Sequence, residues 1–289
     1  MSLKIGVLVD SYRLPLAEAL DAAAESGADG VQLFATSGAM APWNLDGAAR
    51  RSLLAGVEAR GLILSALCGD LGGHGFELRA DNREKVRKSE QIVGLAAELG
   101  VPVMTTHIGV VPEHRNATYR VMVIALRELT SFARMHGVAV AIETGPEPPV
   151  RLLQFIEDVG EEGLGVNFDP ANLVMVQGCS AAEAFGTLRD YTVYTHAKDG
   201  RMVKKGDPVA IYNAFAEGAP DDFRLDDYFL ELPLGEGAVD FPAYLRAVAA
   251  SRYEGYLTIE RESGDDRRGD IARGVAYLRD QLKRLVVQS

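Results

Sequence analysis

Short apolar runs recur along the chain, separated by segments with a different spacing of hydrophobic residues. The runs are rich in β-branched residues and almost continuously apolar, which is typical of parallel strands that are covered on both faces. They are KIGVLV (4–9), GVQLFA (30–35), LILSALCG (62–69), VPVMTTHIG (101–109), VAVAIETG (138–145), LGVNFD (164–169), VYTHAKD (193–199) and YLTIERE (256–262). The pattern predicts eight buried strands.

Between these runs, apolar residues recur at every third or fourth position, as they do on a helix with one buried face. Clear examples are residues 14–27, 81–100, 119–137 and 267–286, and the first three end in glycine, a common stop signal. Dividing 289 residues among eight strand-helix units gives about 36 residues per unit, which suits a barrel of eight such units. We therefore predict the α/β class, with one (β/α)8 TIM-barrel domain over residues 1–289.

An open, doubly wound sheet is the alternative arrangement of alternating strands and helices. That fold commonly carries a GxGxxG motif after its first strand when it binds a dinucleotide. The first run of this chain is followed by DSYRLPL instead, and no stretch has the composition of a linker. These observations favour the closed barrel.

Composition narrows the environment and the partners. The chain is 47% hydrophobic and 25% charged, which is typical of soluble proteins, and no apolar stretch is long enough to cross a bilayer. The first residues lack the features of a secretory signal, so we expect a cytoplasmic protein. The net charge of −11 argues against nucleic acid as a partner, because affinity for nucleic acid comes largely from Lys and Arg.

Five of the runs end in ionisable side chains. These are His107, Glu143, Asp169, His196 and Glu260. Since the carboxyl ends of all strands in such a barrel point to the same face, where active sites of this fold lie, we expect the five groups to converge. Taken alone, each acid is explained by a helix cap and each histidine by an ordinary hydrogen bond, but the combination on successive strands favours a shared site.

Several buried acids repel one another unless a cation compensates their charge. Two Glu, one Asp and one His offer hard oxygen ligands and one imidazole. Such a set suits Mn²⁺, Mg²⁺, Co²⁺, Fe²⁺ or Zn²⁺ in expanded coordination, and it differs from a closed zinc site made of thiolates. The group therefore predicts one divalent metal ion, and among these ions we expect Mn²⁺.

Several motifs follow one another in a specific order. They are AIETG (141–145), GVNFDPANL (165–173), THAKDG (195–200), LPLGEGAVDFPAYLRAV (232–248) and YLTIERE (256–262). With these motifs the chain resembles the xylose isomerase-like TIM barrel superfamily (sugar phosphate isomerase/epimerase family), in particular members related to ketose 3-epimerases and inosose dehydratases. The resemblance implies that Glu143, Asp169, His196 and Glu260, separated by 26, 27 and 64 residues, are the metal ligands.

The chain departs from the ketose epimerases at one position. Those enzymes usually have a substrate-binding His three residues after the metal-binding Asp, where this chain has Asn172. An amide donates and accepts hydrogen bonds but does not titrate, so the substrate cannot be transferred from the family. We expect Asn172, His107 and Lys198 to bind the substrate.

The expected activity is that of a divalent-metal-dependent sugar or polyol isomerase or epimerase that acts through an enediolate on a hydroxy-carbonyl substrate. Glu143 and Glu260 would serve both as ligands and as the catalytic base and acid. An inosose-type dehydratase and a non-catalytic sugar-binding barrel are the alternatives. An apurinic endonuclease is disfavoured, because Asn172 replaces a histidine of its zinc cluster and no Asp-x-His pair follows His196 shortly.

Two loops are expected to shape the site. The interval from Gly200 to Leu234 is unusually long, and long ordered connections commonly cover a site or contact a partner. We expect it to lie over the barrel mouth or against another subunit, and the family resemblance is consistent with a homo-oligomer. The glycine-rich stretch CGDLGGHGF (68–76) is expected to form a wall of the pocket.

Overall fold

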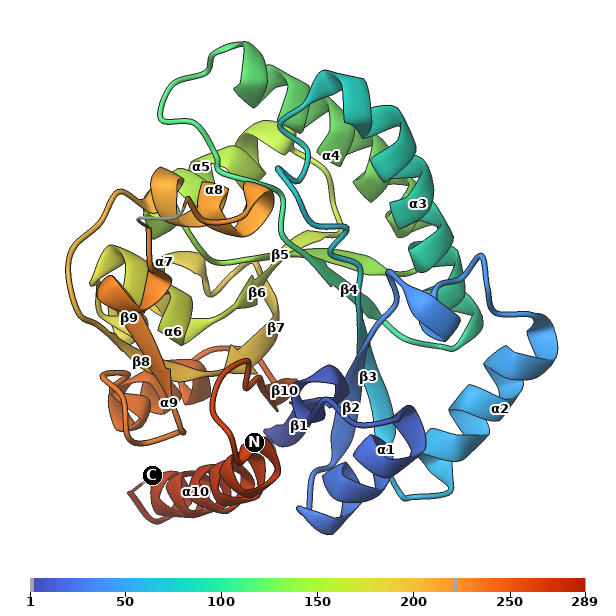
Figure 1. Cartoon of the computed structure of the whole chain (residues 1–289), viewed down its shortest axis with the longest axis vertical. Coiled ribbons are helices and arrows are strands. Elements are labelled where there is room, and N and C mark those ends of the chain that lie inside the picture. The colour runs from blue at the N-terminus through green and yellow to red at the C-terminus, as the bar shows by residue number, and fades with distance from the viewer. Residues whose placement is uncertain (1–2, 221–222, 289) are drawn as a thin grey trace.

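Eight parallel strands close into a barrel in the computed structural model, which describes residues 3–220 and 223–288 (Figure 1). Around the barrel the strands follow the order β1-β10-β7-β6-β5-β4-β3-β2, so β10 closes the barrel between β1 and β7. The strands are β1 (Lys4–Leu8), β2 (Gly30–Phe34), β3 (Ile63–Cys68), β4 (Val103–Thr106), β5 (Ala139–Glu143), β6 (Leu164–Phe168), β7 (Thr192–Ala197) and β10 (Tyr256–Ile259). The predicted fold class is confirmed, and each of the apolar runs supplies a strand.

Helices surround the barrel and cover the outer face of its strands (Figure 1). They are α1 (Leu16–Glu25), α2 (Gly47–Glu58), α3 (Arg79–Glu98), α4 (Ala117–Met135), α5 (Pro149–Val159), α7 (Ala181–Leu188), α9 (Phe241–Ala249) and α10 (Arg267–Gln288). Two further helices lie at the carboxyl end of the barrel, α6 (Pro170–Asn172) directly after β6 and α8 (Pro208–Glu217) after β7. No helix within the described residues has both the length and the apolar content needed to cross a membrane.

The pleat of each strand sorts its residues between the helices and the barrel interior. In β5, Val140 and Ile142 join the large core shared with the helices, whereas Ala141 belongs to a smaller apolar cluster inside the barrel. Tyr194 of β7 lies in that interior, where its hydroxyl is 2.7 Å from Ser65 Oγ and 2.6 Å from Thr258 Oγ1. Because side chains two positions apart share a face, the last inward-facing residue of each strand lies at the carboxyl mouth of the barrel.

The predicted seventh run does not form one continuous strand. β7 ends at Ala197, and Asp199 begins β8 (Asp199–Met202), which pairs antiparallel with β9 (Phe229–Leu232) in a separate sheet. The Asp199 carboxylate accepts hydrogen bonds from the backbone N–H groups of Gly200, Gly235, Gly237 and Val239. This carboxylate therefore ties the start of β8 to the turn before α9, and the chain leaves the barrel.

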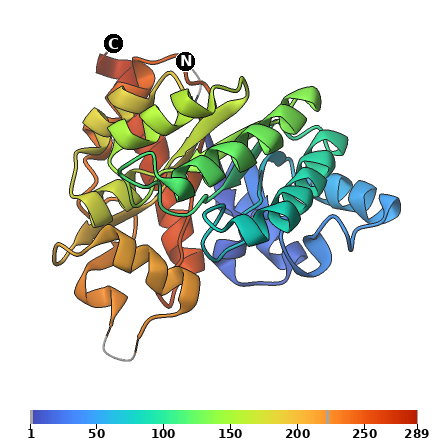
Figure 2. The same cartoon turned by 90° about the horizontal axis from the view of Figure 1, so that it is seen from above.

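The interval after β7 folds into an excursion of its own, made of β8, α8, the short turn Leu225–Asp227 and β9. Figure 2 shows this orange segment projecting from the body of the barrel. Tyr212, Asn213, Phe215 and Ala216 of α8 line a cavity together with residues at the carboxyl ends of the barrel strands. The excursion therefore lies over the barrel mouth, which is one of its two expected placements.

Candidate metal centre

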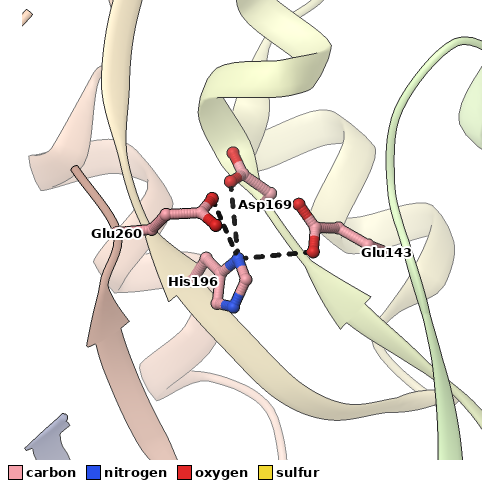
Figure 3. Close-up of side chains that lie close together, drawn as sticks. All are labelled: Glu143, Asp169, His196 and Glu260. Carbon is pink, nitrogen blue, oxygen red and sulfur yellow. Dashed lines mark ion pairs between the residues drawn. The ribbon is translucent and has the colours of Figure 1, made fainter. Parts of the chain in front are cut away.

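The four predicted ligands come from four strands of the barrel. Glu143 is the last residue of β5, and Asp169 and Glu260 directly follow β6 and β10. His196 is the inward-facing residue near the end of β7, next to Thr258 in the parallel ladder. All four are buried, and one potential ligand atom from each lies within 4.8 Å of the others (Figure 3).

His196 Nδ1 is the centre of this group. It lies 3.5 Å from Glu143 Oε2, 3.7 Å from Asp169 Oδ2 and 3.4 Å from Glu260 Oε2. Ligand atoms that each lie about 2.0–2.5 Å from a shared ion are separated from one another by roughly 3–4 Å. The spacing of the four groups therefore fits a single divalent ion.

Asp169 supplies a second test of this fit. Its Oδ1 caps α6 by accepting hydrogen bonds from the backbone N–H groups of Ala171, at 2.7 Å, and Asn172, at 3.0 Å. Its Oδ2 is buried without a hydrogen-bond partner and faces the imidazole. Since an unsatisfied buried carboxylate oxygen is costly, a bound cation would satisfy this atom.

The orientation of His196 depends on a residue that the sequence did not reveal. His196 Nε2 lies 2.9 Å from Gln32 Oε1, and Gln32 Nε2 donates to Thr105 Oγ1 at 2.7 Å. With Nε2–H donating to the amide, Nδ1 is the imidazole atom left to bind a metal. A glutamine inside the apolar run GVQLFA was the available signal, because a polar side chain in a buried strand needs a partner.

Two amides hold Glu143. Asn167 Nδ2 donates to Glu143 Oε2, and Asn172 Nδ2 donates to Glu143 Oε1, both at 3.1 Å. Asn172 also donates to the carbonyl oxygen of Thr144 and lines the cavity above the cluster. The predicted substrate residue thus also fixes one of the carboxylates.

Lys198 approaches the cluster from beyond β7. Its Nζ donates to Glu260 Oε2 at 3.0 Å and also contacts Glu262 Oε2. Burial alone would lower the pKa of Lys198, but the negative charges of Glu260 and Glu262 outweigh burial and hold it well above its usual value. Lys198 therefore lines the cavity as an ammonium group that is already paired with carboxylates.

His107 directly follows β4 and lies between two carboxylates. Its Nδ1 is 3.2 Å from Asp70 Oδ2, and its Nε2 is 3.5 Å from Glu143 Oε1. Burial would lower the pKa of His107, but the charges of Glu143 and Asp70 raise it to about 10. Asp70 belongs to the glycine-rich stretch that was expected to form a wall of the pocket, but its pairing with His107 was not predicted.

The cluster stabilises positive charge at its centre. Burial opposes the ionisation of Glu143 and Glu260, yet nearby cations outweigh it and lower the pKa of both carboxyls, His107 and His196 acting on Glu143, Lys198 and His196 on Glu260. Burial likewise opposes a charged imidazole, but Glu143 and Glu260 raise the pKa of His196 well above its usual value. The surroundings thus favour a cation between three carboxylates.

A cavity of about 230 Å³ lies over the cluster. Its size suits a single small molecule, because pockets for drug-sized ligands have volumes of roughly 300–1,000 Å³. Glu143, Glu260, His107, Asn172 and Lys198 line it, whereas Asp169 and His196 lie beneath. The glycine-rich stretch 68–76 forms part of the wall, as expected, through Asp70, Gly72, Gly73 and His74. The remaining lining residues are Glu77, Gly109, Val110, Tyr212, Asn213, Phe215, Ala216 and Glu262.

Comparisons with known proteins agree with this architecture. The model of a protein family described as xylose isomerase-like TIM barrel matches residues 20–281. No curated protein gives a significant match to the chain. A solved xylose isomerase domain protein from Planctomyces limnophilus is 28% identical with a TM-score of 0.80, over 99% of this chain and 98% of its own.

Two further solved structures share the fold at lower identity. A D-tagatose 3-epimerase-like protein is 18% identical with a TM-score of 0.77, over 99% of both chains. A xylose isomerase-like TIM barrel protein from Mycobacterium smegmatis, solved in complex with magnesium, is 19% identical with a TM-score of 0.72, over 98% of this chain and 97% of its own. At these identities the likeness establishes the fold alone.

Proposed function

This chain belongs to the xylose isomerase-like TIM barrel family, and on that premise we propose that it is a divalent-metal-dependent sugar or polyol isomerase or epimerase. The observation that carries the proposal is the buried group of three carboxylates and one imidazole at the barrel mouth. The unpartnered Asp169 Oδ2 supports a bound cation there. Oxygen donors with one nitrogen suit Mn²⁺ or Mg²⁺, and magnesium accompanies one of the similar structures.

Glu143, Asp169, His196 and Glu260 would hold the ion. When bound there, a divalent ion would polarise the carbonyl and a neighbouring hydroxyl of a sugar and stabilise the negative charge that forms on deprotonation. Glu143 and Glu260 approach the centre from opposite sides (Figure 3). One carboxylate takes a proton from one face of the reacting carbon, and the other, protonated before this step, returns its proton to the opposite face. The exchange inverts the configuration and leaves the first group protonated.

The cavity wall supplies the groups that would position the substrate. His107, braced by Asp70, offers an N–H donor, and Asn172 offers an amide next to Glu143. Lys198 offers an ammonium hydrogen beside Glu260. We assign substrate binding to these three residues, because hydroxyl and carbonyl oxygens need donors at fixed positions.

Three outcomes share the first proton transfer. Return of the proton to the same carbon from the other face gives an epimer, and return to the neighbouring carbon gives an isomer. Loss of a β-hydroxyl instead would give a dehydrated product, the reaction of a dehydratase. Asn172 does not titrate, so it binds in every case and transfers no proton.

The test is solvent exchange with the Mn²⁺-loaded protein in D₂O, over a panel of ketoses, inososes and their acid derivatives. We expect at least one compound to take up deuterium at the carbon beside its carbonyl, as followed by NMR. Glu143→Gln and Glu260→Gln should each slow this exchange by about 10²–10⁴-fold, the usual contribution of a general acid or base. The nature of the product then separates epimerase, isomerase and dehydratase.

Glu236→Gln is the matched control, because Glu236 lies exposed in the turn before α9 and does not line the cavity. Its exchange rate should equal that of the wild-type protein. If no compound exchanges although the protein binds Mn²⁺ and sugar, the chain is a sugar-binding barrel without turnover. If Glu143→Gln loses the metal and keeps the activity, the proposed role of the metal is wrong.

A further inference from the structure

We infer that Glu262 makes this site select uncharged polyhydroxy compounds over phosphate esters and other anions, by neutralising the ammonium group of Lys198. This inference rests on the proposed function, whose substrate class it narrows. Lys198 is the one lysine that lines the cavity, and no arginine is present among the described lining residues. His107 also lines the cavity and can carry positive charge, but it already lies between the carboxylates of Asp70 and Glu143. An anionic substrate would therefore depend mainly on Lys198.

The ammonium group of Lys198 is not free to pair with an anionic substrate. Its side chain is 5% exposed, and Nζ contacts Glu260 on one side and Glu262 on the other. An ammonium group has three N–H donors, so two are engaged and one remains. That remaining hydrogen can serve a substrate hydroxyl, but the positive charge is already balanced by two negative ones.

The rest of the cavity wall adds to this effect. The lining carboxylates are Asp70, Glu77, Glu143, Glu260 and Glu262. Two of them are held in place, since Glu77 Oε1 accepts from the backbone N–H of Val110 at 2.7 Å and Asp70 Oδ1 accepts from that of Gly72 at 2.9 Å. A phosphate in this cavity would face like charges at close range, whereas hydroxyl groups could donate to the same oxygens.

The chain segment that carries Glu262 is fixed by the excursion. Glu231 of β9 accepts from the backbone N–H of Glu262 at 3.0 Å and pairs with Arg261 Nη1 at 2.6 Å. The buried Arg261 also pairs with Asp270 of α10 at 2.9 Å. The two ion pairs of Arg261 therefore fix the backbone next to Glu262, and this places the Glu262 carboxylate against Lys198.

Glu260 and Glu262 both contact Lys198, but they have different roles in the site. Glu260 belongs to the cluster of potential ligands, whereas Glu262 lines the cavity and is absent from that cluster. The side chain of Glu262 is 63% exposed. Removing its charge should therefore alter what the cavity accepts without opening a hole in the core.

The experiment compares D-sorbitol with D-sorbitol 6-phosphate, a pair that differs only in the phosphate and lacks a reactive carbonyl. Binding to the Mn²⁺-loaded protein, dialysed free of excess metal, is measured by calorimetry, and each ligand is also titrated into buffer. We expect the wild-type protein to bind sorbitol at least about tenfold more tightly, a difference of about 1.4 kcal/mol. Glu262→Gln should shrink or reverse this preference by about tenfold or more, because it frees the charge of Lys198.

Glu254→Gln is the control, since Glu254 is exposed just before β10, at the end of the strand opposite to Glu262. It should keep the wild-type preference, and thermal melting should show that both variants are folded. The inference is overturned if wild-type protein binds the phosphate ester as tightly as sorbitol, or if Glu262→Gln keeps the wild-type ratio. If the phosphate ester binds better than sorbitol while solvent exchange occurs, this inference fails and the proposed function stands. If neither polyol binds, the inference also fails. The proposed function is rejected separately, by the absence of solvent exchange.

Discussion

Glu147 is a buried carboxyl outside the candidate metal centre. It is 2% exposed, and its Oε2 lacks a hydrogen-bond partner. Burial raises the pKa of Glu147 from 4.5 to about 7, although backbone hydrogen bonds at Val111 and at Glu147 itself act in the other direction. Near neutral pH the protein therefore carries a group that is more easily ionised in the unfolded chain than in the folded one.

The stability of the protein should depend on pH through this residue. Because the folded pKa is the higher one, the contribution of protonated Glu147 is complete below pH 4.5 and is lost as the pH rises through about 7. Glu147→Gln lacks this dependence. Relative to the wild-type protein, its free energy of unfolding should rise by ~3 kcal/mol between pH 5 and pH 8, since one pKa unit corresponds to about 1.4 kcal/mol.

Urea unfolding at several pH values measures this difference. Glu157→Gln, at an exposed position of α5, is the control and should follow the wild-type curve. A constant offset between Glu147→Gln and wild-type protein across this range would mean that Glu147 does not titrate as described.

At the scale of elements, α8 and the glycine-rich stretch after β3 together form the roof of the cavity. His74 Nε2 lies 2.8 Å from Glu217 Oε1, which links the glycine-rich stretch to the end of α8. On the other side, the Tyr212 ring of α8 packs over Gly145, which follows β5 closely. A Cβ at Gly145 would lie 2.8 Å from Tyr212 Cζ, so only glycine allows this approach.

Gly145→Ala should therefore loosen the roof. Either the Tyr212 ring must swing away or α8 must lift, because a Cβ cannot occupy that space. We expect faster limited proteolysis within residues 203–220 and a higher KM, with Mn²⁺ affinity unchanged. Mass spectrometry of the fragments locates the cleavage.

Gly186→Ala in α7 is the matched substitution, because an added Cβ there meets nothing within 4 Å. It should leave proteolysis and KM as they are in the wild-type protein. Equal cleavage rates for Gly145→Ala and Gly186→Ala would show that the contact between Tyr212 and Gly145 does not hold α8 in place.

At the scale of the whole molecule, a bound ion would join four of the barrel strands, β5, β6, β7 and β10. A ligand that binds only the folded state stabilises it by about 2.7 kcal/mol at a hundred times its Kd. For a chain of this size we expect Mn²⁺ at that excess to raise Tm by roughly 4–5 °C. Calorimetry with and without EDTA measures the shift.

Two variants decide whether the stabilisation comes from the candidate centre. Glu143→Gln should lose most of the Mn²⁺-dependent rise in Tm, because it removes one ligand charge, whereas Glu254→Gln should keep the whole rise. An equal rise in both variants would locate the bound metal elsewhere.

The sequence by itself determined the barrel and the order of its strands. Buried parallel strands require continuous apolar runs, and the helices that cover them require a period of 3.6 residues, so both patterns are visible locally. The carboxyl ends of all strands share one face, and this rule was enough to group His107, Glu143, Asp169, His196 and Glu260. The structure brings the last four of them within 4.8 Å of one another. Their role in metal binding remains a prediction.

Only the tertiary structure decided which groups surround that cluster, because these contacts join residues far apart in the chain. Gln32 orients His196 across 164 positions, and Tyr212 reaches the cavity from a helix outside the barrel. The strand through His196 stops at Ala197 because backbone N–H groups up to 40 positions away converge on Asp199. Periodicity records which face of an element is buried, whereas the partner of a polar side chain is set by how the strands close around it.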